Sequence, residues 1–255
     1  MNKFIIIILF FLFVVSCNDS KEVYFSSLQI KKGLFFKRGS KKPFTGKTIT
    51  KYKNGKKKSN YFFQNGVLEN VITWDKNGRK YLEKFLKNRK IHEKVTTWHD
   101  NGVKLSEEFY RDKKKNGKSI YWYNNGKKEK ESLYKNNKLD GVTIYWDRNG
   151  KKKKNIFYDN GIENKIIFYK DEEPIRVLIF YKNGSKKTEF FYSNRELNGK
   201  ITNWYLNGGK ISEELYKDGK KNGKSTYWKK NGVKKRDVFY SDGIKEKEFI
   251  YNILN

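Results

Sequence analysis

One short phrase recurs along the chain: an aromatic residue, two variable residues and then Asn-Gly. All six tryptophans of the protein occupy its first position, at Trp74, Trp98, Trp122, Trp146, Trp204 and Trp228. Phe180 begins a seventh copy, and an eighth copy keeps Tyr52 but lacks the aromatic first residue. The copies close on Gly55, Gly78, Gly102, Gly126, Gly150, Gly184, Gly208 and Gly232, which recur every 23 or 24 residues apart from one step of 34. A fixed period of this length predicts an array of identical small units.

A second periodic position divides each unit into two. The residue eight positions after each repeat glycine is apolar or aromatic, and the set is Phe63, Leu86, Tyr110, Tyr134, Tyr158, Tyr192, Tyr216 and Tyr240. Another turn signal follows at once, for example Asn160-Gly161 and Asp242-Gly243. Glycines this frequent would break helices, and the aromatic and β-branched residues between them favour strands. Each unit is therefore predicted to contain two strands and two turns.

Turns this closely spaced leave no room for crossover connections, so neighbouring strands must be antiparallel. The predicted fold class is all-β: one elongated antiparallel β-meander of repeated hairpins, with about 18 strands and a length on the order of 85 Å. Asn-Gly accommodates positive φ at both central positions, which predicts type I′ turns at the tryptophan phrase.

The register of one hairpin predicts what each face of the sheet carries. If Asn125-Gly126 is a two-residue loop, Trp122 lies opposite Glu129. Because side chains alternate along a strand, one face then carries Ile120, Trp122 and Leu133, and the other carries Tyr121, Tyr123 and Tyr134. We take the tryptophans and the tyrosines at the periodic positions as the candidate binding surface.

The long step between Gly150 and Gly184 predicts one extra strand. Ile-Phe-Tyr at 156–158 recurs at 167–169 and again at 179–181. We assign an extra strand at about 164–170, followed by a turn between Asp171 and Pro174. One additional strand reverses the direction of every later strand. The tryptophan-type turns at Gly78, Gly102, Gly126 and Gly150 are therefore expected along one edge, and those at Gly208 and Gly232 along the other.

The first residues have the pattern of a secretory signal. Lys3 precedes an unbroken apolar run from Phe4 to Val15, which is too short to span a bilayer because a spanning helix needs about 20 residues. A short apolar segment after a positive start predicts a signal peptide, here an N-terminal signal helix. The predicted organisation is a signal peptide at 1–16, a tether and first edge strand at 17–42, and the repeat array at 43–255. Within the tether, Leu28 to Phe36 is expected to pair at the sheet's edge.

The single cysteine falls where the signal ends. Val14-Val15-Ser16-Cys17 resembles the bacterial lipobox, which implies that Cys17 is acylated and becomes the first residue of a mature lipoprotein. More than one acyl chain makes membrane anchoring stable. The alternative is an ordinary signal peptide with an incidental cysteine. The lipobox predicts a location in the bacterial cell envelope, with the outer membrane or cell surface favoured because no Asp directly follows Cys17.

The pattern Gly-Lys-x-x-x-Trp-Tyr-x-Asn-Gly, at 117–126 and again at 199–208, resembles the MORN-repeat variant of the YwqK-type antitoxin family. The resemblance extends over about 46–251 and implies a MORN-like single sheet. It also implies neutralisation of a partner toxin by binding, while membrane-occupation members of the wider group imply contact with lipid or protein. A lipobox does not suit an antitoxin that acts in the cytoplasm. It fits an envelope role, or immunity against a toxin that arrives from outside.

The sequence offers little for catalysis, so we predict no enzyme activity and no cofactor. The only histidines, His92 and His99, would lie on opposite faces of one strand, about 23 Å apart, which does not form a metal site. Paired acids recur at one repeat position as Glu107-Glu108 and Glu213-Glu214, and are expected to be cross-strand partners of lysine.

The charge leaves two functions open. Lys and Arg number 58 against 28 Asp and Glu, a net charge of +30. Lysine runs beside turns suit either a solvated sheet margin or a polyanion site. The first hypothesis is a membrane-anchored scaffold that binds a protein partner, either a toxin or an envelope protein. The alternative is an envelope protein that binds anionic lipid or acidic glycan. Nucleic acid is disfavoured as a partner, because export past a membrane separates it from the chain.

Overall fold

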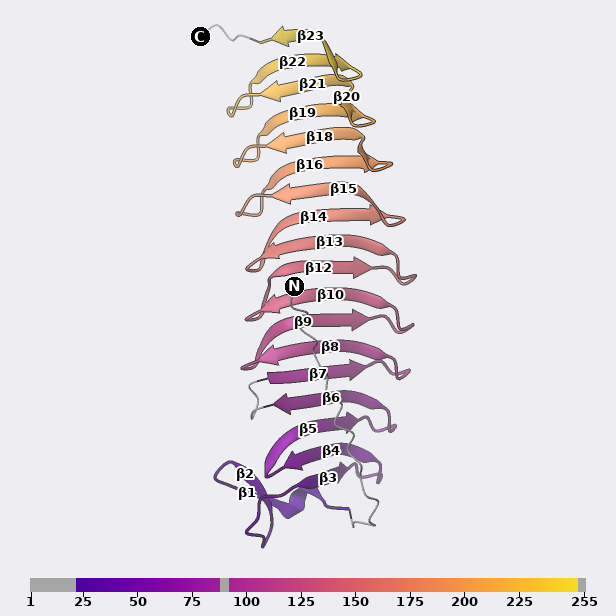
Figure 1. Ribbon diagram of the computed structural model, residues 1–255, viewed down its shortest axis with the longest axis vertical. Helices are drawn as coiled ribbons and strands as arrows, with labels where there is room; N and C mark the ends of the chain where they lie inside the picture. The colour runs from indigo at the N-terminus through magenta and orange to yellow at the C-terminus, as the bar shows by residue number, and fades with distance from the viewer. Residues whose placement is uncertain (1–21, 88–91, 252–255) are drawn as a thin grey trace, which may run out of the picture.

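The computed structural model describes residues 22–87 and 92–251, and the repeat array in it is one long antiparallel sheet (Figure 1). Its strands are β3 (Gly46–Lys51), β4 (Lys57–Gln64), β5 (Val67–Trp74), β6 (Lys80–Lys87), β7 (His92–Trp98), β8 (Lys104–Arg111), β9 (Lys114–Trp122), β10 (Lys128–Lys135), β11 (Lys138–Leu139), β12 (Gly141–Trp146), β13 (Lys152–Asp159), β14 (Ile162–Lys170), β15 (Glu173–Phe180), β16 (Lys186–Ser193), β17 (Glu196–Leu197), β18 (Gly199–Trp204), β19 (Lys210–Lys217), β20 (Lys220–Lys221), β21 (Gly223–Trp228), β22 (Lys234–Ser241) and β23 (Ile244–Ile250). The predicted all-β meander is confirmed. The predicted signal helix and Cys17 lie outside the described residues.

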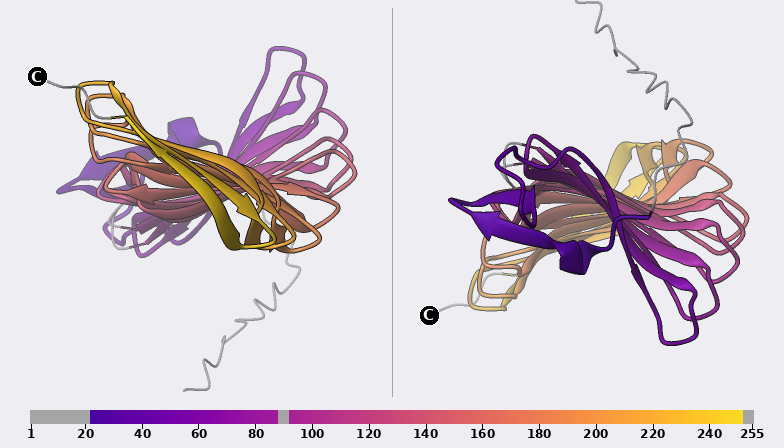
Figure 2. Two further views of the ribbon diagram at one scale, coloured as in Figure 1. Left: turned by 90° about the horizontal axis from the view of Figure 1, so that it is seen from above. Right: turned by 90° about the horizontal axis from the view of Figure 1, so that it is seen from below.

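The number of strands agrees with the number of turns in the sequence. Three of the strands are interrupted by one residue, so that β11 and β12, β17 and β18, and β20 and β21 each extend along a single neighbour. Counting each such pair once gives 18 strands. Strands β3 and β23 lie at opposite ends of the sheet, and no ladder among the described residues joins them. The sheet twists strongly along its length (Figure 2).

The predicted extra strand is β14, which pairs with β13 and β15. Asp171 and Glu172 form the turn after it, both with positive φ. Pro174 belongs to β15 rather than to this turn, and it lies at a register shift opposite Tyr169, where a missing N–H is tolerated. The predicted change of edge is confirmed. The strands that lead into the turns at Gly78, Gly102, Gly126 and Gly150 are β5, β7, β9 and β12, which point to the right in Figure 1. Those that lead into the turns at Gly208 and Gly232 are β18 and β21, which point to the left.

The prediction of type I′ turns at the tryptophan phrase is wrong. At the β9–β10 connection only Gly126 has positive φ, 84°. Its N–H donates to the Tyr123 carbonyl at 2.9 Å, and the Tyr123 N–H donates to the Lys127 carbonyl at 2.9 Å. These bonds define a three-residue loop, a type I turn closed by a left-handed glycine and followed by a bulge. Trp122 consequently lies opposite Lys128 and not opposite Glu129.

Type I′ geometry occurs instead at the second turn of every unit in which the structure describes that turn. Asn136 and Asn137, for example, have φ of 50° and 69° and connect the directly paired Lys135 and Lys138. Among the turns within 22–87 and 92–251, four of this kind contain no glycine, and they are Asp112-Lys113, Asn136-Asn137, Asp171-Glu172 and Asn194-Arg195. The twist of the flanking strands therefore selects the turn even where the residues do not favour it.

The segment before the array folds as a cap. The prediction that Leu28 to Phe36 pairs along the edge of the main sheet is wrong, because a turn at Gly33 pairs β1 (Leu28–Lys31) with β2 (Leu34–Lys37) as a separate hairpin after a 3₁₀ turn at Phe25–Ser27. The cap packs on the first repeat through aromatic rings. Phe35 and Phe44 lie with centroids 4.8 and 5.6 Å from that of Phe63, which is buried.

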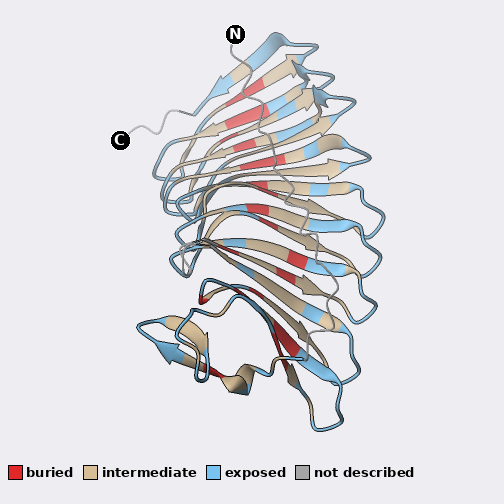
Figure 3. Ribbon diagram, turned by 60° about the horizontal axis from the view of Figure 1, so that its bottom comes forward, coloured by how far each residue is buried: buried red, intermediate tan, exposed pale blue. Residues whose placement is uncertain are grey.

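Buried positions follow the middle of the strands (Figure 3). Many of them carry small polar side chains, among them Ser106, Ser119, Ser132 and Thr143. The Thr143 hydroxyl donates to that of Ser132 at 3.2 Å. A single layer has no second layer against which to bury large residues, so cross-strand neighbours supply much of the stability. The described residues contain no helix long and apolar enough to cross a membrane.

A candidate binding surface on each face of the sheet

The register assigns every side chain to a face. Residues opposite one another in an antiparallel ladder share a face, and consecutive residues of a strand lie on opposite faces. We call the face that carries Glu131 the first face and its opposite the second face. Ile120 and Ile144 pair with Glu131 from either side, so they also lie on the first face. Trp122 and Leu133, each two positions from one of these residues, lie there too.

The residue five positions after the repeat glycine is a carboxylate in most units, and these carboxylates form a column that runs across the strands. Its members are Glu83, Glu107, Glu131, Glu189, Glu213 and Asp237, and Asn155 takes the position on β13. Glu131 accepts from Lys118 at 2.6 Å and from Lys128 at 2.8 Å. Burial raises its pKa, but the two lysine hydrogen bonds outweigh burial and hold the pKa below its usual value. We call a carboxylate of this column together with its basic partners a rung. A rung with two lysines, as at Glu107, Glu131 and Glu213, carries a net positive charge.

The same lysines link this column to the tryptophans. Lys128 Nζ, bound to Glu131, also lies 5.5 Å from the centroid of Trp146. In equivalent pairs the separation is 4.1 Å for Lys80 and Trp98, 5.6 Å for Lys104 and Trp122, 5.5 Å for Lys186 and Trp204, and 5.6 Å for Lys210 and Trp228. A cation at this distance is attracted to the ring face. The lysine that neutralises the acid therefore also fixes the indole.

An exposed apolar column forms the other border of the surface, and it is absent from the residues we predicted for the site. Its members include Phe85, Phe109, Leu133 and Leu215, which are 46%, 37%, 42% and 40% exposed. Gly141 makes room for Leu133, since a Cβ on this glycine would lie 3.1 Å from Leu133 Cδ1. The sequence signal for this column is the apolar residue that precedes the periodic tyrosine. Together, the tryptophans, the lysine–carboxylate rungs and this column form what we call the rung surface.

The rung surface changes face at β14. From Glu131 the register passes through Ile144, Asn155, Ile167 and Val177 to Phe190, all on the first face. Glu189 is adjacent to Phe190 and thus lies on the second face, with Glu213.

The predicted binding residues are divided accordingly, and the structure does not bring them into one surface. The first face carries Trp74, Trp98, Trp122, Trp146, Tyr192, Tyr216 and Tyr240, and the second face carries Trp204, Trp228, Tyr110, Tyr134 and Tyr158.

The tyrosine side of each unit holds saturated polar networks. Glu108 accepts from Tyr110 at 2.8 Å, from Lys115 at 2.5 Å and from Tyr121. Burial, together with the bond to Glu108, raises the pKa of Tyr110 and of Tyr121 to about 12. The prediction that these acids pair with lysine is confirmed, here and at Glu214 with Lys221. Groups that already satisfy one another have little capacity left for a ligand.

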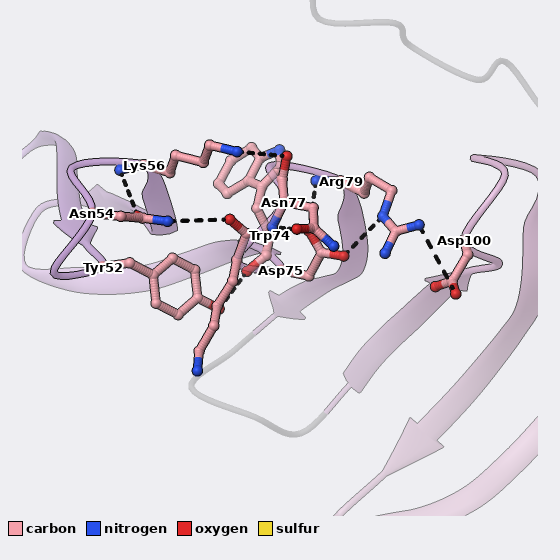
Figure 4. A network of polar contacts seen from close by, with 9 residues as sticks. Tyr52, Asn54, Lys56, Trp74, Asp75, Asn77, Arg79 and Asp100 are labelled. Atoms are coloured by element: carbon pink, nitrogen blue, oxygen red, sulfur yellow. Dashed lines mark hydrogen bonds and ion pairs between the residues drawn. The ribbon is translucent and has the colours of Figure 1, made fainter.

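Side chains of the tryptophan-type turns bind the main chain of the next such turn (Figure 4). Tyr52 donates to the Trp74 carbonyl at 2.8 Å, Asn54 to that of Lys76 at 3.4 Å, and Lys56 to that of Asn77 at 3.3 Å. The pattern recurs in later units. At the position equivalent to Tyr52 two units on, His99 Nε2 lies 2.8 Å from the Trp122 carbonyl oxygen. The asparagines of the phrase therefore link one turn to the next, the glycines take positive φ in these turns, and one histidine is explained without a ligand.

Comparison with known protein families supports the nature of the repeats. The family model described as the MORN repeat variant matches residues 115–136 and 139–171, from β9 to the turn after β14. No curated protein matches the chain significantly. Residues 115–171 thus contain MORN repeat variants, a kind of repeat that commonly binds proteins or membranes.

Proposed function

We propose that the protein is a non-enzymatic scaffold that binds an acidic protein partner through the rung surface. The observation that carries this proposal is the composition of the rungs at Glu107, Glu131 and Glu213, in which two lysines surround one carboxylate between a tryptophan and an exposed apolar residue. Around Glu131 these are Lys118, Lys128, Trp146 and Leu133. A surplus of positive charge attracts acidic partners, and exposed apolar side chains provide contact area.

The sequence indicates where in the cell this scaffold would act. The lipobox resemblance at Cys17 supports anchoring to the bacterial envelope by lipid, outside the cytoplasm. The likeness to antitoxin repeats supports an antitoxin-like or immunity-like role, in which the partner is a toxin neutralised by binding. Neither point depends on the rung surface, and each can fail without the other.

The alternative is an envelope protein that binds a polyanion, such as anionic lipid or acidic glycan. The net charge of +30 and exposed turn lysines such as Lys113 and Lys229 favour it. The twist of the sheet argues against a flat membrane as the partner. Adjacent strands are rotated by roughly 20–25°, so two rungs that lie two strands apart differ in orientation by about 40–50°. A plane contacts few such rungs at once, whereas a protein can follow them.

Matched charge variants test the proposal. Lys104→Gln with Lys128→Gln removes two cations from the rung surface, and Lys130→Gln with Lys154→Gln removes two from the second face, where they lie 4.2 and 4.9 Å from tyrosine ring centroids. We expect envelope extracts to yield a protein that the wild type and the second variant bind in equal amounts and that the first variant binds in a smaller amount, because the first variant keeps the lysines around Glu213. Equal capture by both variants would contradict the proposal.

A vesicle assay with the same variants tests the alternative. Flotation with anionic phosphatidylglycerol vesicles that falls equally in both variants, and falls as salt rises, would favour a general polyanion surface instead.

A further inference from the structure

We propose that the chain carries two separate copies of the partner site, one on each face of the sheet, so that a single chain links two molecules of the same acidic protein. The inference rests on the proposed function. It adds the number of sites, their positions and the fact that they point in opposite directions.

The first step is the geometry of β14. One extra strand reverses the direction of all later strands and also exchanges the faces on which equivalent residues lie. Ile167 of β14 pairs with Asn155, which occupies the carboxylate column, and with Val177. The carboxylate column resumes at Glu189, which pairs with Leu178, the neighbour of Val177. The rung surface therefore ends on the first face and begins again on the second.

The second step is that the two surfaces have the same chemistry. Glu131 is bound by Lys118 and Lys128 at 2.6 and 2.8 Å on the first face. Glu213 is bound by Lys200 and Lys210 at 2.9 and 2.8 Å on the second face.

The aromatic and apolar borders also agree. The second lysine of each rung lies 5.5 Å from the Trp146 centroid in one case and 5.6 Å from the Trp228 centroid in the other. Leu133 is 42% exposed and its equivalent, Leu215, is 40% exposed. A partner that recognises one surface will recognise the other.

The third step is that the two surfaces are not continuous. The charged rungs of the first face end at β13 to β15. There the successive cross-strand neighbours on that face are Asn155, Ile167 and Val177. Val177 and Leu178 are buried. Since the sheet itself separates its faces, a partner seated on the rungs of β6 to β12 does not reach those of β16 to β22. Each half must then hold its own partner molecule.

The occupant is an acidic protein rather than a membrane. The rungs at Glu107, Glu131 and Glu213 are net positive, and within each half the carboxylate position recurs two strands away, about 9.6 Å along the sheet. One membrane surface cannot contact two opposite faces, and the twist seen in Figure 2 rotates the rungs within each face. Carboxylates and apolar side chains on a folded partner can follow that rotation.

A photocrosslinking amino acid such as p-benzoylphenylalanine tests the proposal in the full-length chain, expressed in its native cell. Placed at Leu133 or at Leu215, it projects from an exposed, equivalent position on the first or the second face. Placed at Tyr134 or at Tyr216, one residue away, it projects from the opposite face and serves as the matched control. Adducts are identified by mass spectrometry.

We expect the same partner at Leu133 and at Leu215, no adduct at the two tyrosine positions, and an adduct with two partner molecules when both leucine positions carry the probe. Adducts at one leucine only, or a double variant that never exceeds one partner molecule, would overturn the bivalent arrangement and leave the proposed function standing. Adducts at the tyrosines, or at no position, would contradict the proposed function itself.

Discussion

The hydroxyl of Tyr123 donates a hydrogen bond of 2.9 Å to the main-chain carbonyl of Trp146, one unit further along the chain. Tyr181 makes the same bond to Trp204 at 2.7 Å. We expect Tyr123→Phe to lower the free energy of unfolding by about 1 kcal/mol, the usual net value of one such hydrogen bond. Urea denaturation followed by tryptophan fluorescence measures the change.

Tyr145→Phe is the control for this prediction. The Tyr145 ring lies under Lys154 at 4.9 Å, and its hydroxyl makes no hydrogen bond to another described residue. We expect a change within about 0.5 kcal/mol. Equal losses in the two variants would mean that the hydroxyl bond between turns is not what stabilises the array.

Glu131→Gln should destabilise the sheet by about 1 kcal/mol at neutral pH, because Lys118 and Lys128 lose their common anion. The pH dependence gives a sharper test. The folded-state pKa of Glu131 is lowered, so its contribution is present above its unfolded pKa and is lost as pH falls through the folded value.

Between neutral pH and about pH 4, the region of the unfolded glutamate pKa, the difference in stability between wild type and Glu131→Gln should persist, and it should shrink in more acidic solution. Glu129→Gln, an exposed residue of the bulge, should behave as the wild type. A difference that does not depend on pH would contradict an electrostatic role.

Gly141→Ala should be strongly destabilising. Gly141 has φ of 104°, and an added Cβ would lie 3.1 Å from Leu133 Cδ1. A left-handed backbone costs a residue with a Cβ roughly 1–2 kcal/mol before any contact is counted. Gly209→Ala is the control, since Gly209 has no positive φ and its Cβ would meet nothing closer than 3.4 Å. Denaturant midpoints should fall for the first variant and stay or rise for the second.

Lys113→Gly should stabilise the chain by about 0.5–1 kcal/mol. Lys113 has φ of 63° in a type I′ turn, where glycine avoids the strain of the left-handed region. Lys114→Gly, one position on and inside β9, should be destabilising, because glycine weakens a strand. Thermal denaturation compares the two. If both substitutions destabilise the chain, contacts of the Lys113 side chain contribute more to stability than its left-handed backbone costs.

Removal of residues 160–170 should restore a regular array, since the step from Gly150 to Gly184 then equals the 23 residues between Gly55 and Gly78. The turns at Gly126 and Gly208 would move to the same edge, as an even number of strands would separate them. Spin labels at Asn125 and Asn207 report this by pulsed electron resonance, with a shorter distance expected in the deletion variant. An unchanged distance in a folded variant would contradict the role of β14.

Much of this fold was predictable because its determinants are local and repeated. The glycine spacing fixed the strands, and the 34-residue step located β14 and the change of edge. The turn types were not predictable from composition, since Asn125 uses its side chain rather than a left-handed backbone. Its Oδ1 accepts from the Lys127 N–H at 3.1 Å, and its Nδ2 donates to the Arg148 carbonyl at 2.8 Å.

The surface was harder to predict than the fold. Equal positions in the repeat share one face only while an odd number of strands lies between them, as β8 lies between Trp98 and Trp122. The division of Trp122 and Trp204 between faces depends on the register at β13 to β16, which includes three bulges. The exposure of Leu133 depends on Gly141 in the next strand. Both are relations between strands that no single repeat displays.

The bonds between tryptophan-type turns all run in one direction, from an earlier unit to a later one, as in Tyr52 to Trp74 and Tyr205 to Trp228. The aromatic cap around Phe63 closes the end where this series starts, and β23 ends the sheet with Ile244 and Ile250 largely exposed. Stability in such a stack is a sum over neighbouring units. The array should therefore unravel from its carboxyl end, and limited digestion should leave a nested family of fragments that share one amino terminus.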